Sequence, residues 1–506
     1  MYPCSHLCPN GLRLGQPQRK TNGKVRSVSH TPADANRILS FLHHIDGTAS
    51  PTDGAFELAK GDEVGRTEVA DDQQMISAAD YDPSLDRRED ERRRVGQLER
   101  AEGVQNVEMV EEEEIVEGED EEDDVDDMFA VGGGEKKRRT VRRVKKLAVP
   151  ALITTTLDAA ADAEGYYQTI LGEQLDGGRY QVFAVLGKGM FANVVRARVL
   201  VGEDGDAGRE VAIKIIRCQE SMHKAGQKEA AILNKLQQAD PDDKKHVVRL
   251  ERSFEHRGHL CLVFESLSMN LRDVVKKFGK DVGLNIRAVR AYAHQLFLSM
   301  GLLRKCNIMH ADIKPDNILV NEQKTVLKLC DLGSAADASE NEITPYLVSR
   351  FYRAPEIILG YPYDPALDIW SVGCTLYELY TGKILLPGRS NNQMLLLMME
   401  LRGRFSAKMI KRARFGADYF DDMGAFASVE RDRVTGGDVV KKVQITKPTR
   451  DLRARLLPHA SAQSQMKDDE RRLLLSFVDL LDRCLALDPA RRITPKEALA
   501  HPFIRG

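Results

Sequence analysis

Residues 308–320 read IMHADIKPDNILV, a stretch that sets Asp312, Lys314 and Asn317 among mostly apolar neighbours. Nineteen residues after Asp312 comes Asp331, the first residue of the tripeptide DLG. Phosphoryl transfer needs a carboxylate that orients a hydroxyl, a cation that neutralises the transferring phosphate, and oxygen ligands for Mg²⁺. The residue types and spacing here match those of enzymes that transfer phosphoryl groups. On that match, Asp312 is the predicted base and Lys314 the predicted cation. Asn317 and Asp331 are the predicted Mg²⁺ ligands.

A glycine-rich segment and a lysine-bearing strand precede this stretch. Residues 186–194 read LGKGMFANV, which fits G-x-G-x-x-G-x-V with alanine in place of the third glycine. The pattern is weak evidence alone, but strands are expected on both sides of it, which argues against a dinucleotide-binding turn. Residues 211–214 read VAIK, and Lys214 on an apolar strand needs an anionic partner because an unpaired buried ammonium is costly. Glu229, on the inward face of the next helical pattern, is the expected partner, with Glu220 as the alternative.

Three further motifs predict structural contacts. The tripeptide APE at 354–356 closes the segment that begins with DLG, and its Glu356 is expected to pair with Arg492 in a buried bridge. Asp368, which begins the run DIWSVG, is expected to brace the loop around the predicted base. Each motif alone has an ordinary explanation, such as a surface ion pair. Their order and spacing together favour one fold.

In these motifs, residues 180–503 resemble a eukaryotic protein kinase domain of the CMGC group. The ending SRFYRAPE at 349–356 and a long insertion at roughly 383–448 are similar to that group. Within it, the similarity is closest to the pre-mRNA-processing factor four kinases, nuclear enzymes of the splicing machinery that are related to the DYRK kinases. The stretches that carry this closer resemblance are 162–167 (DAEGYY), 262–270 (LVFESLSMN), 310–321, 343–352 (ITPYLVSRFY) and 368–383 (DIWSVGCTLYELYTGK).

The resemblance implies an α+β, bilobal protein kinase fold preceded by a disordered N-terminal region. The small lobe, mostly β with one key helix, would cover about 180–265. The larger, mostly α lobe would cover about 266–503.

The activity that the resemblance implies is transfer of the γ-phosphate of ATP to serine or threonine hydroxyls of proteins, and Lys314 favours these acceptors over free tyrosine substrates. A pseudokinase scaffold is the alternative. Such a protein would be expected to have lost Lys214, Asp312 or Asp331, and all three are present. Leu332 replaces the usual phenylalanine after Asp331 and is expected to pack in the same apolar position.

The resemblance also implies how ATP is held. Lys214 would clamp the α- and β-phosphates, with the glycine-rich loop over them. Phe264 would be the gatekeeper, and Glu265 and Leu267 would give backbone hydrogen bonds to adenine. Ser349 would hydrogen-bond near the predicted base. The residues expected to bind ATP are Leu186, Gly187, Lys188, Gly189, Val194, Ala212, Lys214, Glu229, Phe264, Glu265, Leu267, Asn270 and Leu319.

Regulation is expected in the activation segment. Tyr346 occupies the position at which relatives carry an activating phosphotyrosine, placed by the kinase on itself, and Arg353 would help to bind that phosphate. Thr344 is a second candidate, and an unmodified loop is the alternative. Ala311 stands where an arginine usually binds an activation-loop phosphate, so Arg353 or Arg350 would have to replace it.

Residues 1–160 contain two charge blocks of opposite sign and no sustained helix or strand period. Residues 108–127 are acidic and residues 136–146 read KKRRTVRRVKK, so the region is expected to stay extended. The basic run, from Lys136 to Lys146, predicts a nuclear localisation signal for an import receptor. A solvated linker and direct RNA or DNA binding are the alternatives, and the lack of interleaved aromatics argues against nucleic acid. The acidic block would be a solvated tail or a docking site for basic partners.

The chain has no apolar stretch near the 18 or so residues of a membrane span. We therefore expect a soluble protein without membrane association, located in the nucleus. Its expected cofactors are ATP and Mg²⁺. Its expected partners are protein substrates among the splicing factors, and the spliceosome.

Overall fold

The computed structural model describes residues 56–60, 76–78, 80–83, 85–90, 92–93, 161–202, 206–340, 343–431, 437–459, 463 and 466–506. These residues belong to one unit that runs from Gly54 to Gly506. The charge blocks at 108–127 and 136–146 lie outside the described residues. The localisation signal and the acidic tail therefore stay predictions.

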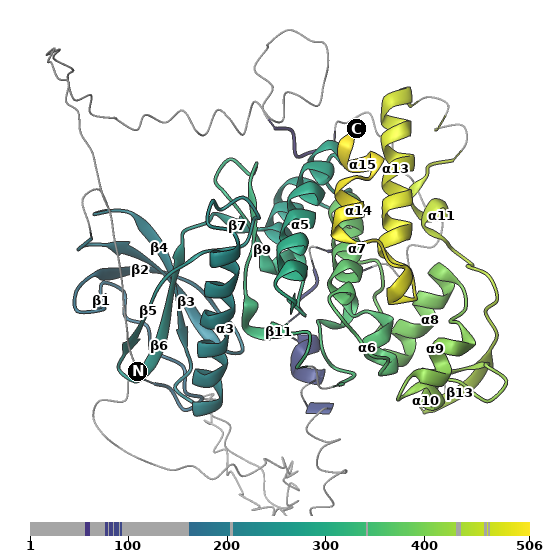
Figure 1. The fold of residues 1–506 in the computed structure, drawn as a ribbon, viewed down its shortest axis with the longest axis horizontal. Coiled ribbons are helices and arrows are strands. Elements are labelled where there is room, and N and C mark those ends of the chain that lie inside the picture. The colour runs from purple at the N-terminus through teal and green to yellow at the C-terminus, as the bar shows by residue number, and fades with distance from the viewer. Residues whose placement is uncertain are drawn as a thin grey trace, which may run out of the picture. The chain divides into compact units, whose positions relative to one another are not determined.

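Six antiparallel strands and one long helix, α3 (Glu220–Ala239), form the small lobe (Figure 1). The sheet has the order β1-β2-β3-β4-β6-β5. Val211, Ile213 and Ile215 alternate along β4 with less buried residues, as expected for a strand with one face in a core. The strands are β1 (Gln174–Leu175), β2 (Tyr180–Lys188), β3 (Ala192–Val199), β4 (Glu210–Ile216), β5 (Leu250–His256) and β6 (His259–Glu265).

The large lobe is built around α5 (Ile286–Lys305), α7 (Ala366–Thr381) and α13 (Asp468–Cys484). Helix α7 is buried along most of its length, and Trp370 at its centre is fully buried. The remaining helices and helical turns are α4 (Leu271–Val274), η2 (Val275–Gly279), η3 (Pro315–Asn317), η4 (Leu332–Ser334), η5 (Arg350–Tyr352), α6 (Pro355–Leu359), α8 (Asn391–Arg402), α9 (Ala407–Arg412), α10 (Gly416–Tyr419), α11 (Leu452–Leu456), η6 (Pro489–Arg491), α14 (Pro495–Leu499) and α15 (Pro502–Arg505).

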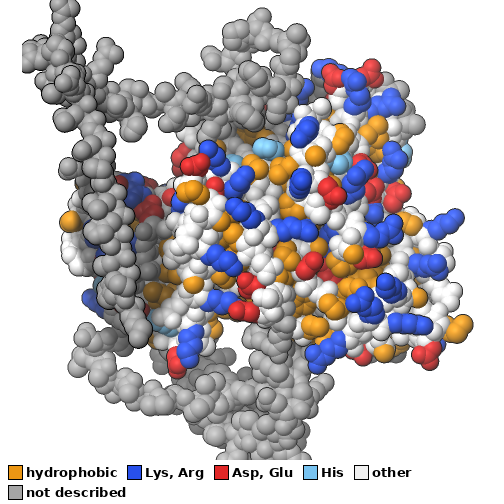
Figure 2. All heavy atoms as spheres, viewed as in Figure 1, with side chains coloured by type: hydrophobic (Ala, Val, Ile, Leu, Met, Phe, Trp, Pro, Cys, Tyr) orange, Lys and Arg blue, Asp and Glu red, His pale blue; other side chains and the backbone are white. Residues whose placement is uncertain are grey.

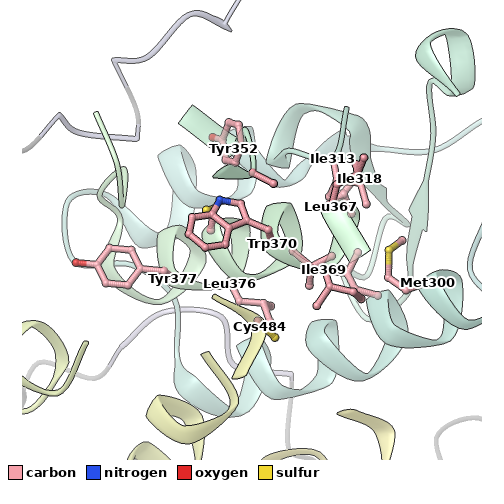
Figure 3. Packing of buried hydrophobic residues seen from close by; sticks show 14 of the residues in the cluster. Met300, Ile313, Ile318, Tyr352, Leu367, Ile369, Trp370, Leu376, Tyr377 and Cys484 are labelled. Carbon is pink, nitrogen blue, oxygen red and sulfur yellow. The ribbon is translucent and has the colours of Figure 1, made fainter. Parts of the chain in front are cut away.

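Two small sheets hold the loop that carries the predicted base. One consists of β7 (Met269–Asn270), β9 (Ile318–Val320) and β10 (Leu327–Leu329), and the other pairs β8 (Ile308–Met309) with β11 (Ala336–Asp337). Residues 310–317, the catalytic loop below, lie between β8 and β9. Figure 3 shows Ile313 and Ile318 next to Leu367 of α7. The apolar residues of 308–320 therefore hold the polar residues of the catalytic loop against a packed core.

Residues 383–448, expected as an insertion, contain α8, α9, α10 and a hairpin. The hairpin pairs β12 (Phe426–Arg431) with β13 (Asp438–Val443) in antiparallel register. Helix α8 packs against α6 and β12. This part of the chain is therefore folded against the large lobe.

Short pieces of the N-terminal region also pack on the large lobe, drawn in purple in Figure 1. Ala59 forms an antiparallel bridge with Leu284, and Ser77 forms one with Lys383. Residues 85–90 are helical. The sequence predicts no packed element here, so these contacts are a finding of the structure.

The surface of the described residues carries mixed charge. Figure 2 shows one face on which Lys and Arg side chains are interspersed with Asp and Glu. Among the described residues, no helix combines the length and apolar character that crossing a bilayer requires.

Candidate active site

An ion-pair cluster joins the two lobes. Lys214 on β4 lies 2.8 Å from Glu229 Oε1 on α3 and 2.8 Å from Oδ1 of Asp331, which follows β10. Lys214 is mostly buried and Glu229 almost completely so. The predicted pair Lys214–Glu229 is therefore present, while Glu220 lies at the start of α3 and pairs with Lys224 instead.

The charges of this cluster depend on one another. Burial alone would lower the pKa of Lys214, but the carboxylates of Asp331 and Glu229 outweigh it and hold the pKa above its usual range. Burial would raise the pKa of Asp331, yet Lys214 holds it well below its usual range. Burial does raise the pKa of Glu229, against the opposing effect of Lys214. Lys214 and Asp331 are therefore charged at neutral pH.

Asp312 is the centre of a second cluster. Its Oδ1 accepts a 2.6 Å hydrogen bond from Ser349, and its Oδ2 accepts bonds from Lys314 at 2.9 Å and from Asn317 at 3.0 Å. Ser349 Oγ also accepts a 3.0 Å bond from Lys314. Burial would raise the pKa of Asp312, but Lys314 and then Arg87 outweigh it, so the pKa lies below its usual range. The carboxylate is therefore ionised, so it can accept a hydrogen bond, and then the proton, from a hydroxyl group. The expected contacts of Ser349 are confirmed.

Asp368 braces the catalytic loop, as the sequence predicts. Its carboxylate accepts the N–H groups of His310 at 2.8 Å and of Ala311 at 3.0 Å. Ala311 is buried and has φ of +60°, a left-handed conformation that is costly for residues other than glycine. Two consecutive hydrogen bonds to one buried carboxylate hold the loop in this conformation, next to Asp312.

The glycine-rich loop joins β2 to β3. Gly189 N–H donates to the Ala192 carbonyl at 2.8 Å, which closes the turn. The Lys188 ammonium lies 3.2 Å from Asp162 and 3.7 Å from the ring centroid of Tyr166. The side chain of Lys188 is thus directed to the DAEGYY segment.

Several of the residues predicted to bind ATP lie on adjoining strands. Ala212 on β4 pairs with Phe264 on β6, and Asn270 on β7 pairs with Leu319 on β9. Val194 on β3 pairs with Lys214. These residues, all predicted to bind ATP, therefore lie at paired positions of adjacent strands.

Two of the residues predicted to bind ATP also have structural contacts. The Glu265 carboxylate accepts a 2.7 Å hydrogen bond from Lys328 and a 3.1 Å hydrogen bond from the Arg249 N–H. Asn270 Oδ1 caps α4 by accepting from the Asp273 N–H at 2.8 Å. Leu186 at the end of β2 is half exposed.

The donor set suits a hard cation. Asn317 donates through Nδ2 to the carbonyl and to the carboxylate of Asp312, which leaves its Oδ1 as the amide atom for a metal. Asp331 offers an ionised and partly exposed carboxylate. Among the described residues, no group of three or more His, Cys, Asp or Glu side chains forms a metal cage. The pair of donors Asn317 Oδ1 and Asp331 suits Mg²⁺, which binds through one or two carboxylates together with substrate phosphates.

The activation segment makes contacts that the sequence does not predict. Arg353, expected to receive a phosphate, lies 2.5 Å from Asp90 and contacts Asn391 at 2.6 Å. Its guanidinium carbon is 5.9 Å from the ring centroid of Tyr346. Thr344 accepts a long 3.4 Å bond from the Tyr346 N–H. The predicted phosphate-binding arginine is thus already occupied by a carboxylate of the N-terminal region.

Sequence reasoning missed the residues that make these contacts. Arg350 lies 2.9 Å from both Asp86 and Asp90, and Arg87 lies 3.3 Å from Asp312. The only available signal was the mixed-charge run at 85–93, LDRREDERR, which suits a helix with i,i+4 ion pairs. Such a run does not say what the helix contacts.

The predicted structural bridge of the large lobe is confirmed. Arg492 donates to Glu356 Oε1 at 2.6 Å and to Oε2 at 2.9 Å, and both side chains are fully buried. Leu332 is buried in the main core, as expected. These contacts fix the end of the activation segment to the large lobe.

Comparisons with known proteins agree with this geometry. Residues 180–504 match the protein kinase domain family. The serine/threonine-protein kinase prp4 of Schizosaccharomyces pombe is 55% identical over 342 residues, which cover 68% of this chain and 70% of that protein. The serine/threonine-protein kinase prpf4B of Dictyostelium discoideum is 47% identical over 348 residues, covering 68% and 41%. A dual specificity tyrosine-phosphorylation-regulated kinase, mbk-2 of Caenorhabditis briggsae, is 34% identical over 351 residues, covering 68% and 41%. The chain therefore belongs to the protein kinase family, as a serine/threonine kinase related to the Prp4 and DYRK kinases.

Proposed function

We propose that this serine/threonine kinase acts on proteins of the splicing machinery through the two ion-pair clusters around Lys214 and Asp312. The observation that carries the chemical part is the set of contacts on the Asp312 carboxylate. It is buried, ionised and held by Lys314, Asn317 and Ser349. An acceptor hydroxyl that reaches Asp312 is oriented for attack and gives it the hydroxyl proton.

The bonds change in a simple displacement. The acceptor oxygen bonds to the γ-phosphorus, the bond from that phosphorus to the bridging oxygen of ATP breaks, and ADP leaves. Lys314 stabilises charge on the transferring group, and Lys214 holds the α- and β-phosphates. Asn317 and Asp331 would hold Mg²⁺, which when bound neutralises phosphate charge.

The nucleotide sits, in this proposal, between β2–β3 and the strands β7 and β9. Backbone groups of Glu265 and Leu267 bind adenine, and Phe264 closes the back of the site. The remaining contacts come from Leu186, Gly187, Lys188, Gly189, Val194, Ala212, Glu229, Asn270 and Leu319.

Tyr346 is the proposed site of autophosphorylation, with Thr344 as a second site. In that reaction the Tyr346 hydroxyl takes the γ-phosphoryl group of ATP, and ADP and a proton are released. The position of Tyr346 beside Arg353 supports this, because an arginine is a ready partner for a phosphate. Mass spectrometry of protein expressed as wild type and as Asp312→Asn should find phosphate on Tyr346 only in the wild type.

The splicing role and the nuclear location rest on the resemblance to the pre-mRNA-processing factor four kinases. The test is to incubate full-length wild-type protein and Asp331→Asn with purified spliceosomal proteins, labelled ATP and Mg²⁺, and to map the phosphosites. Labelling of serine and threonine by the wild type alone supports the proposal. Equal labelling by both proteins, or labelling of unrelated proteins only, contradicts it.

The basic run 136–146 is proposed to bind a nuclear import receptor. A fluorescent fusion of the full chain should accumulate in nuclei, and replacing the Lys and Arg residues of the run with Ala should prevent this. Nuclear accumulation of the variant would show that the nuclear localisation signal lies elsewhere.

A further inference from the structure

The described residues between 76 and 93, called the strap below, run along the large lobe toward Asp312. The strap begins next to the end of α7, where the Ala78 N–H donates to the Gly382 carbonyl at 2.9 Å. Ala78 is fully buried, and its carbonyl accepts a 2.8 Å bond from Arg272. The start of the strap is therefore fixed by backbone contacts, not by surface charge.

Tyr81 provides a second anchor. The Tyr81 ring centroid lies 4.4 Å from the ring centroid of Phe351 in the activation segment. The Arg272 guanidinium carbon lies 5.2 Å from the Tyr81 ring centroid. The Tyr81 hydroxyl donates to Asp86 at 3.0 Å, which ties this anchor to the helical residues 85–90. These contacts direct the helical part across the activation segment.

Arg87 reaches the reacting groups. Its guanidinium lies 3.3 Å from Asp312 Oδ2 and donates to Ser334 Oγ at 2.9 Å. Its guanidinium carbon also lies 5.4 Å from the Phe191 ring centroid, at the tip of the glycine-rich loop. One side chain thus touches the catalytic loop, the segment after Asp331 and the loop expected to cover the phosphates.

The base is covered as a result. Three side chains of the kinase domain already bind the Asp312 carboxylate, and with Arg87 in place its side chain is only 1% exposed. An incoming hydroxyl must approach this carboxylate to hydrogen-bonding distance. The Arg87 guanidinium lies 3.3 Å from Asp312 Oδ2, at the place that an incoming hydroxyl would take.

The acidic residues of the strap cover the surface next to the base. Asp90 lies 2.9 Å from Arg350 and 2.5 Å from Arg353, and Asp86 and Glu89 lie 2.9 and 3.1 Å from Arg350. Arg350 and Arg353 are 2% and 1% exposed. Arg350 directly follows Ser349, which binds the base, so a protein substrate has to pass over the same place.

We propose that the strap is an autoinhibitory segment that occupies the place of a protein substrate, and that phosphate on Tyr346 releases it by competing with Asp90 for Arg353 and Arg350. The regulation rests on the kinase activity proposed above. A phosphate on tyrosine carries about −1.5 to −2 charges at neutral pH, more than one carboxylate. Because Tyr346 lies beside Arg353, a phosphate on Tyr346 can bind the arginines that otherwise pair with the strap.

A different role for Arg87 makes the opposite prediction. If Arg87 supplied a cation to the transferring phosphate, its loss would slow the reaction, as the loss of an arginine finger does. The burial of the base and the cover over Arg350 favour inhibition, because both block the acceptor and neither helps the nucleotide.

The test uses the full-length protein, freed of phosphate by a phosphatase, and a generic serine/threonine protein substrate with Mg-ATP. Two variants loosen the strap independently: Arg87→Ala, and the triple change Asp86→Asn, Glu89→Gln, Asp90→Asn. The matched control is Arg88→Ala, which removes the same charge from an exposed position of the same helical stretch. Thermal denaturation shows whether each variant is folded.

Both loosened variants should raise kcat/KM for the protein substrate at least about fivefold, because the competent fraction of molecules rises. Arg88→Ala should stay within about twofold of the wild type. Unchanged rates in both variants overturn the strap proposal while wild-type transfer upholds the kinase proposal. A fall in the Arg87→Ala rate assigns that side chain to catalysis and also overturns it. Absence of transfer by every protein contradicts the proposed function, and the strap proposal with it.

Hydrogen exchange gives a readout that does not depend on substrate turnover. The amides of residues 85–90 should exchange slowly in the unphosphorylated wild type and faster in the triple variant. They should also exchange faster when Tyr346 carries phosphate. Equal protection with and without that phosphate overturns the competition between phosphate and Asp90.

Discussion

Lys214 Nζ donates a hydrogen bond to Asp331 Oδ1 at 2.8 Å, so a lysine of the small lobe and a carboxylate of the large lobe meet inside the proposed nucleotide site. The same ammonium binds Glu229 on α3. A single cation therefore fixes the position of α3 and of the proposed metal ligand relative to the sheet. Binding of ATP phosphates requires Lys214 to share its hydrogen bonds with them.

Replacing Lys214 with methionine should reduce phosphate transfer at least about a hundredfold, because the α- and β-phosphates lose their cation. The fold should survive, since Glu229 is buried and its pKa is already raised, so it can take up a proton. Labelled-ATP transfer measures the loss, and thermal denaturation measures the fold. Transfer within about tenfold of the wild type, in a folded variant, would remove Lys214 from the mechanism.

Ser349→Ala should lower kcat about tenfold while leaving KM for ATP nearly unchanged. The Ser349 hydroxyl donates to Asp312 and accepts from Lys314, so its loss lets both side chains turn away from the reacting geometry. Ser349→Thr keeps the hydroxyl and should restore most of the rate. A threonine variant as slow as the alanine variant would mean that packing, not the hydroxyl, sets the effect.

Arg492→Met should destabilise the protein by about 3–5 kcal/mol, because it leaves the fully buried Glu356 carboxylate without its partner. The matched control is Arg472→Met, whose ion pair with Asp469 is highly exposed and contributes less than about 1 kcal/mol. Urea denaturation gives both free energies of unfolding. Similar small losses in the two variants would contradict the structural role of the buried bridge.

Stability should fall as the pH drops below about 6.5, and His246 should contribute to this. Burial lowers the pKa of His246 below its usual value of about 6.5. The unfolded chain then binds more protons than the folded one in the window below 6.5, so the contribution is complete above that pH and is lost below it. Each pKa unit of lowering corresponds to about 1.4 kcal/mol.

His246→Asn tests this pH dependence, because asparagine tolerates the positive φ of 55° at this position. The difference in unfolding free energy between pH 7.5 and pH 5.5 should shrink relative to the wild type. The same change at the exposed His459 is the control. An undiminished difference in the His246→Asn variant would contradict the assignment.

The sequence predicts the kinase domain well because its local motifs carry fixed spacings. The pairs Lys214–Glu229 and Glu356–Arg492 are confirmed as predicted. Periodicity places Glu229 on the inward face of its helical pattern, whereas the Glu356–Arg492 pair follows from two motifs that resemble those of protein kinases.

The strap could not be predicted in the same way. Asp86, Glu89 and Asp90 stand in a run of mixed charge without apolar periodicity, which is typical of a solvated helix or an extended chain. Their partners, Arg350 and Arg353, are more than 250 residues away in the sequence. Nothing local distinguishes a carboxylate that finds a distant arginine from one that faces water.

Asp312 is the proposed base of this kinase. The most direct measurement compares full-length wild-type protein with Asp312→Asn for transfer of labelled phosphate from Mg-ATP to a serine/threonine protein substrate. Nucleotide binding by both proteins serves as the control. We expect transfer by the wild type, a loss of at least about a hundredfold in Asp312→Asn, and equal ATP binding. Equal transfer by the two proteins, or ATP binding without transfer by the wild type and by the loosened strap variants, would contradict the account.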